Sequence, residues 1–113
     1  MNRTNNPVNK KDTAPKEGPE GIFRRTLAFN KDAMLCNFSM KKDAEIPLHN
    51  HIHSQIGYVI SGKLEFRTKS SSFKVQAGDS YVFGSNEKHG ALILEDCEVI
   101  EVFTPCREKY KPE

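Results

Sequence analysis

The sequence lacks a hydrophobic run long enough to cross a membrane, and it lacks a concentration of charge of one sign. No stretch approaches the roughly 18 consecutive apolar residues that a membrane-spanning helix needs. The formal net charge is +2 at pH 7, and the lysines are scattered along the chain. Nucleic-acid-binding domains usually present a concentrated basic face. We therefore expect neither a membrane nor a nucleic acid as a partner.

Cysteine is scarce as well. Cys36, Cys97 and Cys106 are an odd number with no CxxC pair, and no apolar signal-peptide core occurs near the start. Both features favour a reducing, cytoplasmic location. Each cysteine is expected to be core filler or a surface thiol rather than a ligand, because free cysteine packs as a small hydrophobe.

The first 20 residues are poor in apolar side chains and hold three of the six prolines. Such a segment cannot bury enough surface to offset its ordering entropy, so residues 1–20 are predicted to form a flexible N-terminal tail. The remainder of the chain is long enough for one small domain. We place this domain at residues 21–107 and a polar C-terminal tail at residues 108–113.

From residue 21 onward the pattern is that of short strands and turns, without a sustained helical period. Ser61-Gly62-Lys63 predicts a tight hairpin turn, and Pro105 should end the last strand because it cannot donate to a ladder. Short, regularly spaced strands predict an all-β sandwich or closed barrel. The strands are expected at residues 33–40, 57–60, 64–66, 73–76, 81–83, 91–94 and 98–104.

All four histidines of the chain lie in two places. His49, His51 and His53 alternate in one short run, and His89 is alone. Residues i and i+2 of a strand point the same way, so two histidines at this spacing can converge on one ion. His49 with His51 and His51 with His53 are equally compatible with the spacing. The alternative is a solvated loop whose histidines bind nothing.

Gln55 comes soon after the histidine run and offers an oxygen ligand. A straight strand from His49 to Gln55 would span about 20 Å, whereas donors to one metal lie about 3–4 Å apart. The chain must therefore bend within residues 50–54 for Gln55 to begin the next strand beside the histidines. His89 would have to come from a neighbouring strand. Imidazole with an oxygen ligand suits zinc, copper, iron or nickel.

The run His49-x-His51-x3-Gln55-x6-Gly62 resembles the first motif of the cupin family, G-x5-H-x-H-x3,4-E-x6-G. Glutamine stands where the motif has glutamate, and Asp43 stands where it has its first glycine. The neutral oxygen of Gln55 carries no charge to the site, so a divalent ion should be held less tightly than by a carboxylate.

The second cupin motif, G-x5-P-x-G-x2-H-x3-N, is matched by Gly78 and His89. Gly84, Asn86 and Ile93 replace its proline, second glycine and asparagine. The resemblance covers about residues 30–107. It implies a single-domain cupin-type double-stranded β-helix, or jelly-roll barrel, with a homodimer as the default assembly.

The cupin resemblance also implies a ligand set for one divalent ion: zinc, nickel, manganese or iron. The implied metal ligands are His49, His51, Gln55 and His89. His53 would then contact the substrate or support the ligands.

A narrower resemblance is to the KdgF type of small cupins, which are associated with pectin degradation. The run from His49 to Val59 is similar to their HxHxHxQxGYV stretch, and Glu101-x-Phe103-x-Pro105-x-Arg107 is similar to their D-x-F-x-P-x-R ending. That type helps to open the ring of unsaturated uronates. The resemblance implies catalytic roles for Glu101 and Arg107, and substrate contacts from His53, Tyr58, Phe103 and Arg107.

The sequence leaves simpler interpretations open for several of these residues. A position of Glu101 on an outer face, with Ile100 and Val102 in the core, fits the pattern equally well, and Phe103 and Tyr58 also fit as core aromatics. For the function, an isomerase-like or lyase-like enzyme on sugar acids competes with two alternatives. One is an iron-dependent oxygenase on a small acid or thiol, and the other is a non-catalytic module that binds a small ligand.

Overall fold

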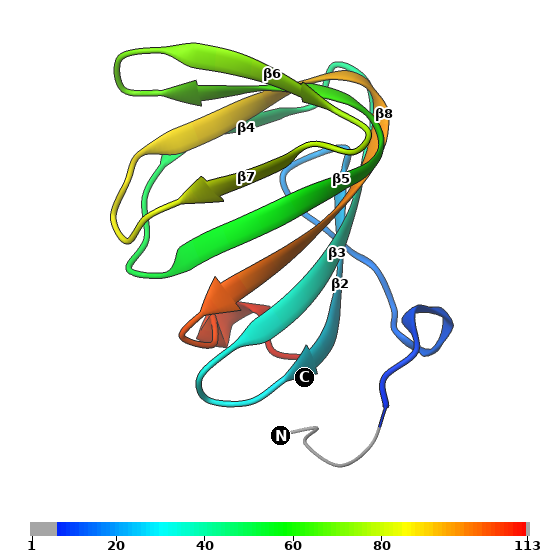
Figure 1. Ribbon diagram of the computed structural model, residues 1–113. Helices are drawn as coiled ribbons and strands as arrows, with labels where there is room; N and C mark the ends of the chain where they lie inside the picture. Colours follow the sequence, from blue (N-terminus) through cyan, green and yellow to red (C-terminus); the bar gives the residue numbers. More distant parts are fainter. Residues whose placement is uncertain (1–6, 113) are drawn as a thin grey trace.

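The computed structural model describes residues 7–112 and is built almost entirely from β-strands (Figure 1). The two helices in this range are short 3-10 turns, and neither is long or apolar enough to span a membrane. The elements are η1 (Lys10–Asp12), β1 (Lys16–Glu17), β2 (Ile22–Phe29), β3 (Met34–Met40), β4 (Glu45–His49), β5 (Ser54–Thr68), β6 (Ser72–Gln76), β7 (Ser80–Phe83), β8 (His89–Thr104) and η2 (Glu108–Tyr110).

The strands form one antiparallel sheet in the order β1-β2-β3-β8-β5-β6, with β4 added to β8 and β7 added to β5. The two longest strands, β5 and β8, pair from Ser54 opposite Thr104 to Thr68 opposite His89. Figure 1 shows that β8 curves back on itself, so that its first part pairs with β4 and its second part with β3. The sheet therefore closes around an interior, which confirms the predicted all-β jelly-roll fold.

The predicted hairpin turn at residues 61–63 is wrong. β5 runs without interruption through it, and the pairing with β8 shifts register between Val59 and Leu64. Gly62 has a φ of 85°, and a Cβ there would lie 2.6 Å from the Cα of Cys97. The turn signal thus marks a β-bulge, where a glycine lets a long strand bend against its neighbour.

The predicted division of the last region into two strands is also wrong. β8 is continuous, and Glu95 and Asp96, which lie between the two predicted strands, are exposed residues within it. Pro105 does end β8, as predicted. The other expected strands are found within a few residues of their predicted limits.

Alternating residues of the long strands fill the interior. Along β8, Val99, Glu101 and Phe103 are buried, whereas Ile100 and Val102 lie on the outer side and are half-buried. This register overturns the alternative in which Glu101 faces outward. All three cysteines are buried and free, in agreement with their expected role as core filler.

The described part of the N-terminal segment contacts the barrel. Lys10 forms an ion pair with Glu98 of β8 at 2.8 Å, and β1 pairs with β2. Near the other end of the chain, the Tyr110 carbonyl accepts a hydrogen bond from Thr26 at 2.5 Å. The domain limits at residues 21 and 107 stay a prediction, and residues 1–6 of the expected tail lie outside the described residues.

Candidate metal centre

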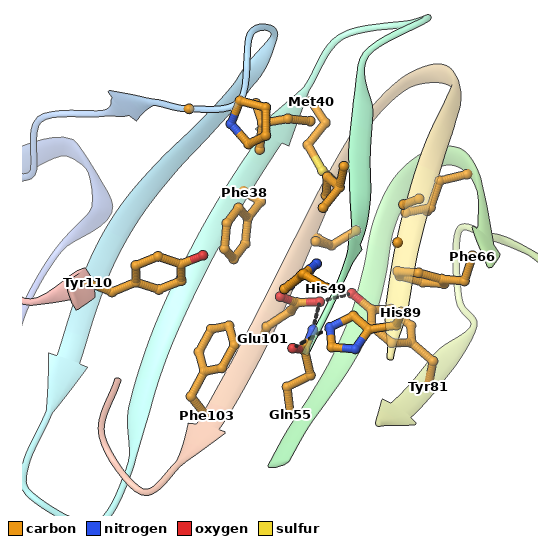
Figure 2. A pocket seen from close by; sticks show the side chains of 18 of the residues that line it. Phe38, Met40, His49, Gln55, Phe66, Tyr81, His89, Glu101, Phe103 and Tyr110 are labelled. Atoms are coloured by element: carbon orange, nitrogen blue, oxygen red, sulfur yellow. Dashed lines mark hydrogen bonds between the residues drawn. The ribbon is translucent and has the colours of Figure 1, made fainter. Parts of the chain in front are cut away.

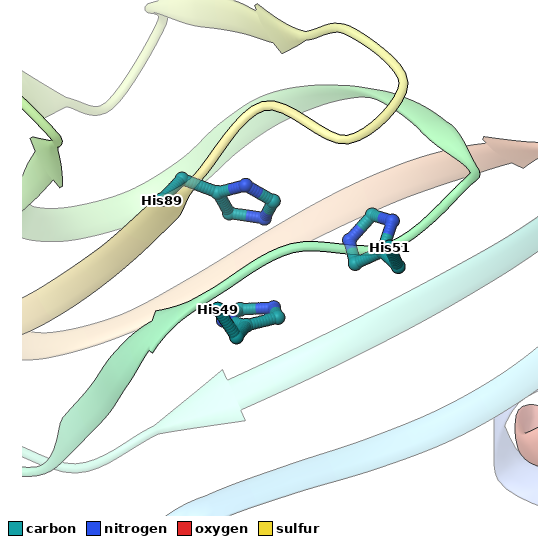
Figure 3. Close-up of side chains that lie close together, drawn as sticks. All are labelled: His49, His51 and His89. Atoms are coloured by element: carbon teal, nitrogen blue, oxygen red, sulfur yellow. The ribbon is translucent and has the colours of Figure 1, made fainter.

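Three histidine rings meet where β4, β8 and the loop after β4 come together (Figure 3). β4 ends at His49 and β5 begins at Ser54, which confirms the predicted bend and leaves His51 in the connecting loop. His89 is the first residue of β8 and pairs directly with His49. The pairing of two strands therefore sets the separation of two of the rings.

One nitrogen from each of the three rings lies within 4.8 Å of the others. The ring centres are 4.5 Å apart for His49 and His89, and 5.1 Å apart for His51 and His89. Donors bound to one ion at about 2.1 Å are about 3–4 Å apart. Small rotations of the rings would thus bring the three nitrogens into coordination distance.

Backbone carbonyls fix which nitrogen of two rings faces the centre. The Nδ1 atom of His49 lies 2.9 Å from the Pro47 carbonyl, and that of His89 lies 2.8 Å from the Glu87 carbonyl. A carbonyl oxygen only accepts, so each Nδ1 carries the hydrogen and donates it. In the neutral rings the lone pair is then on Nε2, which is how metal-binding histidines are commonly oriented.

Gln55 completes the cluster with an oxygen. Its side chain is 5% exposed, and its Nε2 group donates to the Oε2 atom of Glu101 at 3.0 Å. This bond fixes the orientation of the amide, so that Oε1 faces the histidines. Oε1 lies 2.9 Å from Nε2 of His51. It also lies 3.1 Å from Nε2 of His89 (Figure 2).

The contact between His89 and Gln55 fits a bound cation. Nε2 of neutral His89 and Oε1 of Gln55 both present lone pairs, and such a pair repels unless a positive charge lies near it. Burial lowers the pKa of His89, which favours the neutral ring. The donor set, imidazole nitrogens with one amide oxygen, is therefore suited to a divalent transition-metal ion.

His51 shows the same preference for the neutral state. Burial, followed by the positive charge of Arg107, lowers its pKa to about 4. Its Nδ1 atom is buried and has no hydrogen-bond partner among the described residues. A neutral imidazole at ordinary pH is the form that binds metals.

The loop that carries His51 is tied to the loop before β8. The backbone N–H of Asn86 donates to the carbonyl of His51 at 2.7 Å. Asn86 has a φ of 62° and Asp43 has a φ of 74°. These are the positions where the cupin motifs have glycine, and asparagine and aspartate are the side chains that tolerate this conformation best. Two of the motif departures therefore preserve the backbone geometry.

Behind Gln55 lies a buried carboxylate. Glu101 is 7% exposed, and its Oε2 atom accepts hydrogen bonds from Gln55 and from the Tyr81 hydroxyl at 2.6 Å. Burial raises the pKa of Glu101, while the two donated hydrogen bonds oppose that shift. Burial and the neighbouring carboxylate also raise the pKa of Tyr81, so the phenol stays protonated and donates.

The centre opens into a cavity of about 60 Å³ in the interior of the barrel (Figure 2). The ring of Phe83 stacks on His89 with centres 4.4 Å apart and planes 5° from parallel. Arg107 also lines the cavity, with its guanidinium carbon 4.2 Å from the ring centre of Tyr110 and 5.3 Å from that of Phe103. Arg107 has no carboxylate partner among the described residues.

Most of the residues singled out from the sequence come together here. His49, Gln55, His89, Glu101, Phe103 and Arg107 line the cavity, and His51 joins the histidine cluster. His53 lies beside it, with its ring centre 5.4 Å from that of His51. Tyr58 does not approach the cavity, because it is 49% exposed on the outer side of β5.

Sequence reasoning missed two aromatic residues of the site. Tyr81 hydrogen-bonds to Glu101, and Tyr110 closes one side of the cavity. Tyr81 is in a predicted strand, where its alternation with Phe83 is that of ordinary core residues. Tyr110 is in the segment predicted to be a polar tail, and its position in a short 3-10 turn has no signal in the hydrophobic pattern.

Comparison with known proteins gives close relatives. The chain is 33% identical over 101 residues to the pectin degradation protein KdgF of Dickeya dadantii, covering 88% of this chain and 92% of that protein. The structure of KdgF from Halomonas sp. superposes with a TM-score of 0.85 and 29% identity, covering 92% and 98% of the two chains. An RmlC-like cupin from Shewanella frigidimarina superposes with a TM-score of 0.90 and 28% identity, covering 98% and 100%.

The family comparison agrees with the fold and with the histidine cluster. The model of the cupin domain matches residues 37–103, which is more than half of the chain and contains all three clustered histidines. The chain belongs to the cupin family.

Proposed function

We propose that this cupin binds one divalent metal ion and acts on a small sugar acid of the uronate class. The observation that carries the proposal is the convergence of His49, His51, His89 and the Gln55 oxygen beside a cavity that Arg107 lines. The similarity to a protein named for pectin degradation supplies the substrate class, because pectin is built from uronic acids.

The proposed ligands leave coordination positions open. Three imidazoles and one amide oxygen occupy four positions of a five- or six-coordinate ion. The bound ion would supply Lewis acidity to a hydroxyl or carbonyl oxygen of the substrate. The ligands themselves are neutral, so the full charge of the ion acts on that oxygen.

Arg107 is suited to bind the substrate's carboxylate. Its guanidinium is stacked beside two aromatic rings and has no carboxylate partner in the described part of the chain. A planar guanidinium binds a carboxylate through two parallel hydrogen bonds. Its positive charge already acts on the centre, since it adds to the burial that lowers the pKa of His51 and of His89.

The cavity brings the proposed metal ligands and the proposed carboxylate-binding residue into one space. His49, His89 and Arg107 all line it. A sugar acid bound there would therefore place its ring near both. Phe103 and Tyr110, which flank Arg107, are placed to contact such a ring.

The first experiment is metal analysis of protein purified without a metal-affinity tag. We expect near-stoichiometric metal in the parent and almost none in a folded His49→Ala/His89→Ala variant. Equal, negligible metal in both proteins, even after soaking with divalent ions, would overturn the metal site.

The second experiment tests the substrate. We expect the metal-loaded protein to consume unsaturated galacturonate, measured as the loss of its ultraviolet absorbance. Arg107→Ala should raise KM strongly, whereas Arg67→Ala, which removes an arginine paired with Glu65 away from the cavity, should not. Oxygen uptake with small acids or thiols and no reaction with uronates would instead support the oxygenase alternative.

A further inference from the structure

The carboxylate of Glu101 already has two donors in the folded chain. Its Oε2 atom accepts from the Tyr81 hydroxyl at 2.6 Å and from the Gln55 amide at 3.0 Å (Figure 2). Both donors are buried with it. The fold therefore orients this carboxylate toward the side chain of Gln55.

The bond to Gln55 decides which atom of that side chain meets the histidines. A terminal amide has an oxygen on one side and an NH2 group on the other, and it turns over readily unless a partner distinguishes the two. The Oε2 atom of Glu101 acts as an acceptor in this bond, so it pairs with the NH2 group. The oxygen of Gln55 is thereby directed at His51 and His89.

Glycine at position 57 makes this arrangement sterically possible. In the sheet, Gly57 of β5 pairs with Tyr81 on one side and with Glu101 on the other. A Cβ at this position would overlap the end of the Tyr81 ring, including a contact of 2.7 Å with Cε1. The phenol therefore crosses β5 over the bare backbone of Gly57 to reach Glu101.

We propose that Tyr81 and Glu101 are positioning residues for the metal centre: together they hold the amide of Gln55 with its oxygen toward the ion. The assignment rests on the proposed metal site and goes beyond it, because neither residue need touch the ion or the substrate. Partners behind the ligands of a metal typically contribute 10- to 100-fold in affinity.

A double-mutant cycle on metal affinity tests the assignment without any substrate. Cobalt(II) affinity is measured by competition with a chromophoric chelator for the parent, Glu101→Leu, Gln55→Leu and the double variant. We expect Glu101→Leu to weaken binding by 10- to 100-fold in the parent and by less than threefold in the Gln55→Leu background. An equal loss in both backgrounds would show that Glu101 acts through its charge, and would overturn the proposal.

Three further variants separate the loss of these hydrogen bonds from a general loss of the fold. Glu101→Gln keeps an acceptor oxygen and should recover most of the affinity that Glu101→Leu loses. Tyr81→Phe should weaken cobalt binding severalfold, whereas Tyr58→Phe, which removes an exposed hydroxyl from the outer side of β5, should have no effect. Circular dichroism and thermal unfolding check that each variant is folded.

The cobalt absorption spectrum gives a second readout, since its intensity depends on the number of ligands. We expect Glu101→Leu to give the spectrum of Gln55→Leu, as both lose the amide oxygen. A Glu101→Leu variant that binds cobalt less tightly but keeps the absorption spectrum of the parent would overturn the assignment. The metal site itself would stand. Absence of cobalt binding by the parent would overturn the metal site and, with it, this role for Glu101.

Discussion

The phenol ring of Tyr81 lies directly over the α-carbon of Gly57, where any side chain would occupy the same space. We predict that Gly57→Ala lowers the free energy of unfolding by about 1–3 kcal/mol, because overpacking displaces the ring. It should also weaken metal binding. Urea denaturation and cobalt titration measure the two effects. Gly84→Ala is the matched control, since the nearest atom to a Cβ there is 3.9 Å away, and it should be close to neutral.

Asn86 offers a test of backbone conformation beside the site. Its φ of 62° costs an ordinary residue about 1–2 kcal/mol, and asparagine less. We predict that Asn86→Ala lowers the free energy of unfolding by about 1 kcal/mol and that Asn86→Gly leaves it unchanged or raises it. Denaturant titration measures the free energy of unfolding of both variants. Equal effects of the two substitutions would contradict a conformational origin.

Tyr110 is predicted to hold the C-terminal turn against the barrel. Two guanidinium groups contact its ring, with the guanidinium carbons of Arg24 and Arg107 at 3.9 Å and 4.2 Å from its centre. Cation–π pairs of this kind contribute about 0.5–2 kcal/mol each. Tyr110→Phe should keep most of the stability, and Tyr110→Ala should lose about 2–4 kcal/mol by thermal or chemical unfolding. Similar losses in both variants would place the contribution in the hydroxyl instead.

The buried cysteines should be unreactive in the native protein. Burial raises the pKa of Cys36 to about 12 and that of Cys97 to about 11, so very little thiolate exists at pH 8. We predict that iodoacetamide labels these two residues only after denaturant is added, as monitored by peptide mass spectrometry. Rapid labelling of Cys36 in the folded chain would show that the barrel opens readily.

Glu98 should give the protein an acid-sensitive contribution to stability. The hydrogen bonds from Lys10 and Asn37 lower its pKa below the usual 4.5. The contribution is therefore fully present above about pH 4.5 and is lost as the pH falls through the lowered value. Unfolding measured from pH 7 to pH 3 should show a shallower decline for Glu98→Gln than for the parent. Parallel curves would show that Glu98 makes no such contribution.

The fold class and the histidine cluster can be predicted from local features of the sequence. Residues that alternate, such as Met34, Cys36 and Phe38, are buried as the period of two predicts. The bend between His49 and Gln55 is required by the reach of a strand and by the short distances that a shared ion imposes. These inferences need only spacing, and spacing is retained in the folded chain.

Other features depend on partners that are distant in the sequence. The glycine at position 62 has the pattern of a turn, and only the presence of Cys97 beside it shows that β5 continues as a bulged strand. The face on which Glu101 lies depends on register with β3 and β5, because apolar residues occupy both faces of β8. Likewise, Tyr81 reaches Glu101 only because Gly57 has no side chain in its way. The hydrophobic pattern of the sequence does not reveal such a contact.

The pairing of β5 with β8 has a kinetic consequence. It places Gln55 beside residues 34 and 46 positions later in the chain, so no short segment contains more than part of the centre. Contacts between such distant residues form late and slowly in folding. The proposed metal-binding site should therefore form only when the barrel closes. Uptake of an ion during refolding would then report when folding is complete.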